Sequence, residues 1–489
     1  MREGPTLSGL LPFVLKIRAK KYQTELRFAE IHLLARMPKE SVLRKTGRKT
    51  GRESANVRSR AERSNVKTAG EIFADGTLIE LVQSSSVPNK PNLLLWNGTE
   101  ATIAPRVQYA GRSYEATELI ASVGSATRLP SGCCDYASVR ELFTAIASLF
   151  TRHLGLPERE ARLLAYFSIS TWFADCLPTA PGAAIYGPVQ GQGTDILRLL
   201  NCVCRRPLML ADVTPPGLRS LPMCLHPTLL INQPGLSPRM WTLLRTSSQH
   251  GLYVPAGKGG VLDLHGASAV FLGADDVLKI AGGEVLHLSL PPTLFRFTLD
   301  DARLAQIASE LQPKLLTYRL MNWRKVQESE VDFSAFTFPT RELARNLGAC
   351  VADDPELAQE LSSLLEMQDA DARAQHYTDI RYVIIEIILL LLHTRETSAL
   401  RVQKIAESTN ALLRSRGEIV EYSAAEIGWK LRQLGLSRSR DGAGKSLFLH
   451  KETSRRIHEL AGSYGVLARE NLRPGCPDCA KAAQPVVVS

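Results

Sequence analysis

The chain has 489 residues, of which 44% are hydrophobic and 22% are charged, and its formal net charge is +10. This length predicts two to four domains, and the composition is typical of a soluble globular protein. No run approaches the roughly 20 apolar residues that span a bilayer, so we expect no membrane partner and a cytoplasmic location. The nearest run, residues 382–392, is short and contains Glu386.

Positive charge is concentrated at the N-terminus, where residues 1–68 hold 17 Lys and Arg against 6 Asp and Glu. Residues 43–65 contain almost no apolar side chains, so we expect a basic, disordered arm. Such an arm can bind phosphate backbones without reading sequence. A plain solvated tail is the favoured interpretation.

Residues 69–135 are expected to form a small β-rich module. Its short apolar runs are separated by three dipeptides that are typical of hairpin turns, Asp75-Gly76, Asn97-Gly98 and Ala110-Gly111. The spacing of apolar residues then changes to three and four, which predicts two helices over about 137–176.

A degenerate phosphate-binding loop follows these helices. Residues 183–200 contain an apolar strand, a glycine-rich turn and a helix, where an intact loop would have the pattern GxxxxGK[ST]. Gly187 and Thr194 fall in register with that pattern. Gln192 replaces the second glycine, and Gly193 replaces the lysine that contacts the β and γ phosphates. The turn is therefore expected to keep the shape of a nucleotide site without its cation.

The second strand of such a site is degenerate in the same way. Within residues 226–236 four apolar residues lead into Asn232-Gln233, where an active site would have Asp-Glu. The amides match the carboxylates in volume, but they supply neither the charge that supports Mg²⁺ nor a base that orients water. Lys258 is the one attractive replacement for the missing lysine. The predicted nucleotide-binding residues are Gly187, Gly191, Gly193, Thr194, Asn232, Gln233 and Lys258, with no catalytic residue.

If only the charges have been lost, the triple substitution Gly193→Lys, Asn232→Asp and Gln233→Glu should restore binding of MgATP.

Short apolar strands alternate with helical segments from residue 183 to about 292, which predicts an α/β fold with a P-loop NTPase-like parallel sheet core. Both degenerate motifs then lie at the carboxyl ends of strands. The following region is expected to be helical, with helix starts at Asp300, Thr340 and Asp354. The predicted divisions are a basic arm (1–68), a β-rich module (69–135), a helical lead-in with the α/β domain (136–292), a helical region (293–379), a winged helix (380–465) and a tail (466–489).

The winged-helix prediction rests on the order of elements after residue 380. Helices are expected at about 381–393 and 402–414, and Ser423 with Glu426 forms the capping-box signature of a third helix. Residues 437–450 then indicate a hairpin wing. In a winged helix the third helix enters the major groove and the wing contacts phosphate, while protein docking is the alternative use. The predicted DNA contacts are Lys430, Arg432, Gln433, Arg438, Arg440 and Lys445.

Nine cysteines without a regular pattern fit a reducing compartment. Cys476-Pro-Asp-Cys479 resembles half of a zinc site, which needs four ligands. Because no second Cys-x-x-Cys and no His-x₃₋₅-His occurs, two free thiols and no bound metal are the favoured interpretation. The cysteines expected in the core, from their apolar sequence neighbours, are Cys133, Cys134, Cys202, Cys204 and Cys224.

With these pieces in hand, residues from about 180 to 465 resemble the helicase/primase-like P-loop ATPase domains of phage and mobile-element replication proteins. The resemblance rests on GPVQGQGTDILRLL, PTLLINQP, LLRTSSQHG and the run from QKIAESTNALL to SAAEIGWKLRQLGLSRSR. In that family the second piece ends in Asp-Glu, and the third tends to carry arginines where this chain has Gln249 and His250. The resemblance implies an ATPase-like fold, DNA as a partner and assembly into homo-oligomers.

We therefore expect a non-hydrolysing P-loop ATPase-like protein with a DNA-binding winged helix, which acts as a structural or regulatory factor in replication or mobile-element biology. No cofactor is expected under this interpretation. One alternative is a weakly active DNA-dependent ATPase or helicase, which would use ATP and Mg²⁺. Another is a winged-helix transcription regulator whose α/β domain senses a different anionic ligand.

Overall fold

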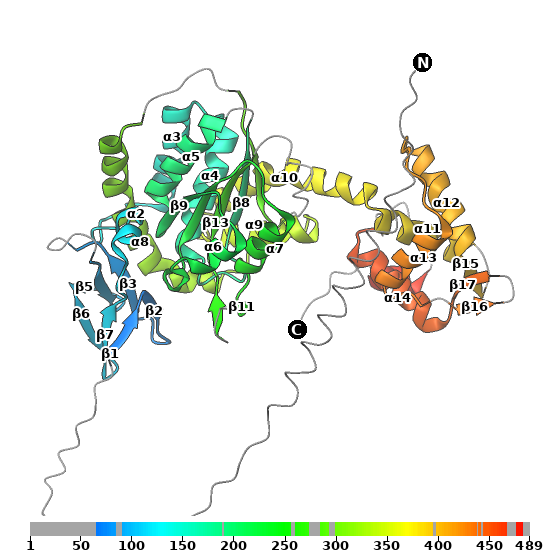
Figure 1. Ribbon diagram of the computed structural model, residues 1–489, viewed down its shortest axis with the longest axis horizontal. Coiled ribbons are helices and arrows are strands. Elements are labelled where there is room, and N and C mark those ends of the chain that lie inside the picture. Colours follow the sequence, from blue (N-terminus) through cyan, green and yellow to red (C-terminus); the bar gives the residue numbers. More distant parts are fainter. Residues whose placement is uncertain are drawn as a thin grey trace, which may run out of the picture. The chain divides into compact units, whose positions relative to one another are not determined.

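Almost all of the predicted basic arm lies outside the residues that the structure describes (Figure 1). The computed structural model describes residues 65–84, 90–187, 190–255, 260–272, 284–292, 299–394, 398–437, 439–441, 444–466 and 476–482.

Seven strands form the β-rich module. Strands β2 to β5 form an antiparallel sheet in chain order, and β1, β7 and β6 form a second sheet. The three predicted turns are confirmed, because they join β2 to β3, β4 to β5 and β6 to β7, and their glycines have positive φ. The strands are β1 (Asn65–Thr68), β2 (Gly70–Ile72), β3 (Leu78–Val82), β4 (Asn92–Trp96), β5 (Ala101–Ala104), β6 (Arg106–Tyr109) and β7 (Arg112–Ala116).

Two packed helices precede the parallel sheet, after the short α2 (Ala121–Ala126). Helix α3 (Val139–Leu154) begins after Ser138, whose hydroxyl accepts a hydrogen bond from the backbone N–H of Glu141, and it ends at the left-handed Gly155. Helix α4 (Glu158–Ser170) is buried over most of its length and continues into η1 (Thr171–Phe173). The two helices predicted over 137–176 are therefore confirmed.

Five parallel strands form the core of the α/β domain. Their spatial order is β14-β8-β13-β10-β9, so the first of them in the chain, β8, lies between the last two. Alternate residues of the strands face two separate hydrophobic clusters, one with α5 (Gln190–Val203) and one with α7 (Pro238–Ser247). Figure 1 shows helices on both faces of this sheet. The strands are β8 (Gly182–Tyr186), β9 (Pro207–Ala211), β10 (Thr228–Asn232), β13 (Ser268–Leu272) and β14 (Leu286–Ser289).

The connections of this sheet are mostly helical. A small hairpin of β11 (Tyr253–Pro255) and β12 (Val261–Asp263) lies between β10 and β13 in the chain. The helices are α5 (Gln190–Val203), α6 (Pro215–Ser220), η2 (Met223–Leu225) and α7 (Pro238–Ser247).

Three helices follow the sheet, α8 (Asp301–Gln327), α9 (Phe338–Ala349) and α10 (Pro355–Thr378). Asp300 caps α8 as predicted, and α10 begins directly after Asp354. The predicted helix start at Thr340 is wrong, because α9 begins at Phe338 and Thr340 is buried in its first turn. Pro339, at the second helical position, favours the earlier start.

Residues 380–466 have a hydrophobic core of their own. A three-stranded antiparallel sheet in the order β15-β17-β16 accompanies four helices. The predicted capping box is present, since Ser423 and Glu426 each bond the other's backbone N–H. The elements are α11 (Ile380–Thr394), β15 (Ala399–Arg401), α12 (Val402–Ser415), α13 (Ala424–Gln433), β16 (Ser439–Asp441), β17 (Gly444–Phe448) and α14 (Lys451–Ser463); α15 (Pro477–Ala482) follows.

Two cysteine predictions are confirmed and three are wrong. Cys202 and Cys204 are buried, whereas Cys133, Cys134 and Cys224 are exposed. Cys224 lies in η2, where its neighbours Met223 and Leu225 occupy the buried positions. Apolar neighbours in sequence therefore do not decide burial, because consecutive side chains of a helical turn point in different directions. In the described part of the chain, no helix is both long and apolar enough to span a bilayer.

Candidate functional site

The two degenerate motifs meet at the carboxyl edge of the parallel sheet. Gly187 directly follows β8, Thr194 lies near the start of α5, and Asn232 is the last residue of β10. The Nδ2 of Asn232 donates a hydrogen bond of 2.8 Å to the Oγ1 of Thr194. Both partners are uncharged, so this pair brings no negative charge to a metal ion.

Gly193 has no room for a side chain. A Cβ atom at this position would lie 2.3 Å from two ring atoms of Phe271 and 2.6 Å from a third. Phe271 is buried in β13, the strand between β8 and β10. The expectation that Gly193→Lys restores the missing cation therefore does not fit the structure, because the aromatic ring fills the space that the Cβ of a lysine would need.

Gln233 is engaged by the backbone of two neighbouring loops. Its Oε1 accepts a hydrogen bond of 2.7 Å from the N–H of Val213, and its Nε2 donates to the carbonyl of Gly235 at 3.3 Å. These contacts tie the loop after β9 to the end of β10. Gly191 falls in the first turn of α5, and Lys258 lies outside the described residues.

His250, near the end of the segment LLRTSSQHG (243–251), belongs to a cluster of three histidines with His226 and His265. His250 stacks on His265 with ring centroids 3.7 Å apart, and its Nε2 bonds the carbonyl of Leu177 at 2.9 Å. The Nδ1 of His226 bonds the carbonyl of His265 at 2.9 Å. Burial, with smaller contributions from His250 and His226, lowers the pKa of His265 to about 4. At neutral pH His265 is therefore uncharged. The cluster packs the residues that follow α7 against the segments that precede β10 and β13.

A buried group of charges joins the β-rich module to the helices and the sheet. Glu80 of β3 contacts Arg205, Arg206 and Arg319 at 2.5, 2.6 and 2.7 Å. Asp175 contacts Arg205 and Arg319 at 3.0 and 2.6 Å. Burial by itself would raise the pKa of Glu80, but the three guanidinium groups outweigh it and the pKa lies at about 2. No local sequence pattern marks this group, because its members come from β3, α8 and the loops that follow η1 and α5.

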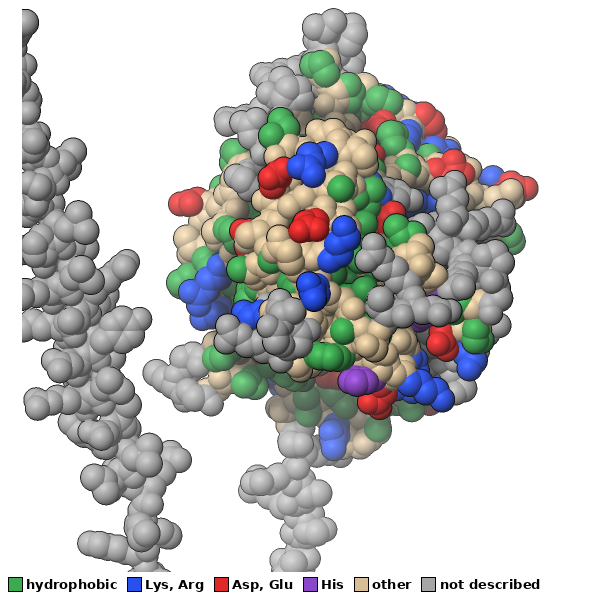
Figure 2. Space-filling view, turned by 90° about the vertical axis from the view of Figure 1, so that its right-hand side faces the viewer, with side chains coloured by type: hydrophobic (Ala, Val, Ile, Leu, Met, Phe, Trp, Pro, Cys, Tyr) green, Lys and Arg blue, Asp and Glu red, His purple; other side chains and the backbone are tan. Residues whose placement is uncertain are grey.

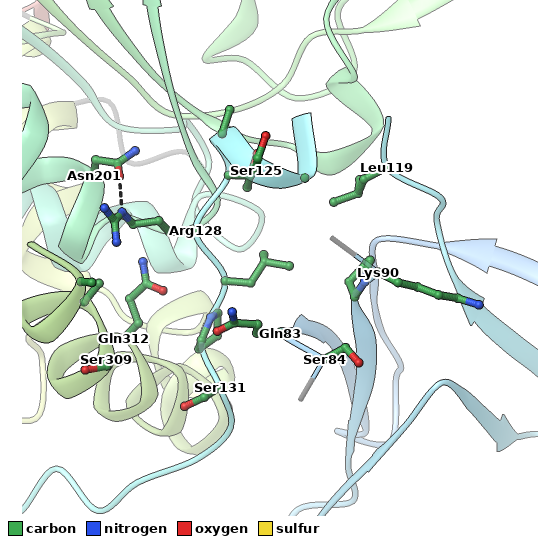
Figure 3. Close-up of a pocket in the computed structure, with 18 of the residues that line it drawn as sticks. Gln83, Ser84, Lys90, Leu119, Ser125, Arg128, Ser131, Asn201, Ser309 and Gln312 are labelled. Carbon is green, nitrogen blue, oxygen red and sulfur yellow. Dashed lines mark hydrogen bonds between the residues drawn. The ribbon is translucent and has the colours of Figure 1, made fainter. Parts of the chain in front are cut away.

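A cavity of about 780 Å³ lies between the β-rich module, α2 and α8 (Figure 3). Its lining includes Lys90 and Arg128, and Arg128 donates to the Oδ1 of Asn201 at 2.7 Å. The hydroxyl of Thr127 and the Nε2 of Gln312 are buried without a protein partner among the described residues. The cavity is large enough for a small anionic ligand, which would supply partners for such groups.

The exposed face of α13 carries most of the predicted DNA contacts that can be located. Arg432, Gln433 and Lys445 of β17 are exposed, and Lys430 is half-buried with its Nζ 5.3 Å from the ring centroid of Trp429. Arg438 lies outside the described residues, and only the backbone of Arg440 is described, in β16.

Trp429 was not among the predicted contacts, and it is 52% exposed. Trp429 lies two residues from each of the buried Ile427 and Leu431, so the helical spacing places it on the opposite, exposed face and could have identified it. Figure 2 shows lysine and arginine side chains interspersed with acidic ones on the face in view.

A group of side chains that could share a metal ion exists in the C-terminal region. Among the described residues it is the only set of three or more His, Cys, Asp or Glu groups that lie close enough, and it is not at the sheet edge. It consists of His393, His458, Cys476 and Cys479.

No protein-family model matches the chain, and no curated protein is a significant match. A full-length MCM homolog from Methanopyrus kandleri is similar over 60% of this chain and 74% of its own, with 14% identity and a TM-score of 0.31. The A form apo structure of the NrS-1 C-terminal region is similar over 76% of this chain and 97% of its own, with 10% identity and a TM-score of 0.31. Similarity of this degree is distant, so function has to be inferred from the site itself.

Proposed function

We propose that the protein is a P-loop-like factor that does not hydrolyse nucleotide and acts on DNA as a structural or regulatory partner, in replication or mobile-element biology. The observation that carries the proposal is the neutral Thr194–Asn232 pair beside the closed position 193. Assembly into a homo-oligomer belongs to the same proposal.

The absence of hydrolysis follows from the chemistry of this edge. Phosphoryl transfer depends on cations around the γ phosphate and on a group that orients water. Asn232 cannot supply charge, Gln233 is bonded to backbone groups, and position 193 cannot hold a lysine while Phe271 keeps its place. Since each tenfold reduction in rate corresponds to about 1.4 kcal/mol, a site without several of these groups has a negligible rate.

DNA binding is proposed for the C-terminal region as a winged helix. The order of helices and strands, and the capping box of α13, support this interpretation. Arg432 and Gln433 face solvent on the helix that would enter the major groove, and Lys445 does so on the hairpin that would serve as the wing. Trp429 adds an apolar surface with a cation beside it, which suits contact with sugars or bases.

The test is a titration of labelled duplex DNA with the full chain, followed by fluorescence anisotropy at several salt concentrations, with and without MgATP. We expect binding whose affinity does not change with MgATP and no release of phosphate. The variant Lys430→Ala/Arg432→Ala/Lys445→Ala should bind more weakly, with a salt slope smaller by about one for each phosphate that it no longer neutralises.

Arg112→Ala is the control, because Arg112 is an exposed arginine at the start of β7, far in sequence from the C-terminal region. It leaves the basic N-terminal arm and the C-terminal region intact, so its affinity should equal that of the natural chain. Unchanged affinity in the triple variant would remove the DNA interface from the proposal. DNA-stimulated release of phosphate would instead support the ATPase alternative.

A further inference from the structure

Four potential metal ligands converge from three helices of the C-terminal region. His393 is the next-to-last residue of α11, and His458 lies in the middle of α14. Cys476 directly precedes α15, and Cys479 lies within it. One ligand atom from each of these four residues lies within 4.8 Å of the other three. Two imidazoles and two thiols are a ligand set that zinc prefers in structural sites.

The measured separations match the edges of a zinc tetrahedron. The two Nε2 atoms of His393 and His458 are 3.1 Å apart, and each lies 3.5 Å from one cysteine sulfur. With Zn–N of about 2.0–2.1 Å and Zn–S of about 2.3 Å, a tetrahedral ion places two nitrogens about 3.3 Å apart and a nitrogen and a sulfur about 3.5 Å apart. The side chains are thus spaced for a shared ion without any rearrangement of the helices.

The orientation of His458 gives independent support. Its Nδ1 lies 2.7 Å from the backbone carbonyl oxygen of Ser454. Since a carbonyl oxygen only accepts, Nδ1 carries the proton, and the lone pair of Nε2 points towards the other three groups. A backbone carbonyl on the far nitrogen is the usual support of a metal-bound histidine. His458 is also 3% exposed, so its ring is held in this orientation by packing.

The short helix α15 needs such an attachment. It has six residues, and a helix of this length is not stable in isolation. In this segment Cys479 is the buried side chain, whereas Pro477, Ala480 and Lys481 are exposed. Apolar burial of a single thiol contributes little to holding a helix against α14, whereas a metal ion bound by Cys476 and Cys479 would fix both ends of its first turn.

We propose that His393, His458, Cys476 and Cys479 form a structural zinc site that fastens residues 476–482 to α11 and α14. The set is complete with four protein ligands, so the ion would have no open position for catalysis. The site is independent of the proposed DNA interface, because none of its ligands belongs to α13 or to the β16–β17 hairpin.

The experiment is elemental analysis of the full chain purified without chelators. We expect about one zinc ion per chain, and less than a tenth of that in the variant Cys476→Ser/Cys479→Ser. The control Cys133→Ser/Cys224→Ser removes two exposed thiols outside the cluster and should keep the natural zinc content. Full zinc content in the Cys476→Ser/Cys479→Ser variant would overturn the proposal.

A second measurement avoids dependence on the folding of that variant. The natural chain, stripped of metal and titrated with Co²⁺, should develop the visible absorption of a tetrahedral cobalt site with sulfur ligands, and equimolar Zn²⁺ should abolish it. His458→Asn should weaken Co²⁺ binding at least tenfold, because even the loss of a group that only supports a ligand costs about 10–100-fold in affinity. Absence of zinc in the purified chain together with no uptake of Co²⁺ would also overturn the proposal.

Discussion

Position 193 limits which side chains fit at the carboxyl edge of the parallel sheet. The backbone of Gly193 lies so close to the ring of Phe271 that even a methyl group would overlap it. Glycine is therefore required here for packing, independently of any role in binding phosphate. A magnesium site would need negatively charged groups at this edge. The adjacent hydrogen bond instead joins two neutral side chains, Thr194 and Asn232.

Gly193→Ala should destabilise the protein by about 1–3 kcal/mol, because the new methyl group overfills a packed site. Phe271→Ala alone should cost about 3–5 kcal/mol through the cavity that it leaves. The double variant should be less destabilised than the sum, since each change relieves the other. Urea unfolding of the four proteins measures this coupling, and strictly additive losses would contradict the close approach.

At the scale of elements, the histidine cluster links the end of α7, the turn before β10 and the connection between β12 and β13. His265 is 3% exposed and has a pKa of about 4, below the value of about 6.5 of an unfolded histidine. The unfolded chain therefore takes up a proton first as the pH falls. The contribution of His265 to stability is fully present above about pH 6.5 and decreases as the pH falls towards 4.

Between pH 7 and pH 5 the loss of stability due to His265 should be about 2 kcal/mol. The variant His265→Phe lacks the titrating group, so its stability should fall by about 2 kcal/mol less over the same range. Urea midpoints at the two pH values measure the difference. Equal pH dependence of the natural chain and His265→Phe would contradict the assignment.

At the scale of the whole molecule, Glu80 connects the β-rich module to the helices and to the loop before β9. Three arginines surround its carboxylate, and all four side chains are buried. A buried ion pair contributes little net energy when complete, but removing one partner is costly. Without Glu80, Arg206 would lose its carboxylate partner, and Arg205 and Arg319 would share Asp175 alone. Glu80 is the only acid of this group that belongs to the β-rich module, so the attachment of the module through these ion pairs depends on it.

Glu80→Gln should destabilise the protein by about 3–5 kcal/mol, because the buried Arg206 would lose its carboxylate partner and Arg205 and Arg319 would keep only Asp175. Glu115→Gln is the matched control, since Glu115 pairs with the half-exposed Arg106 at 3.5 Å within the same module. That exposed pair should contribute about 0–1 kcal/mol. Thermal unfolding of both variants tests the contrast, and similar losses would show that the buried group does not join the module to the helices.

Local patterns in the sequence were sufficient for much of the fold. The five strands of the parallel sheet and the turns of the β-rich module were found from short apolar runs and glycine dipeptides, because both depend on neighbouring residues. The start of α9 was predicted at Thr340, but Thr337 occupies the N-cap position and Pro339 lies in the first turn, where proline is tolerated because its missing N–H has no helical partner. The winged-helix interpretation and the DNA contacts stay predictions.

The sequence by itself determined the element types, the uneven charge and the absence of the charged residues from two nucleotide-site motifs. Only the tertiary structure decided what lies beside those motifs. The ring of Phe271 against Gly193, the arginines around Glu80 and the histidines beside Cys476 and Cys479 all join residues far apart in the chain. Such contacts depend on the packing of whole elements, which residue spacing within one element does not encode.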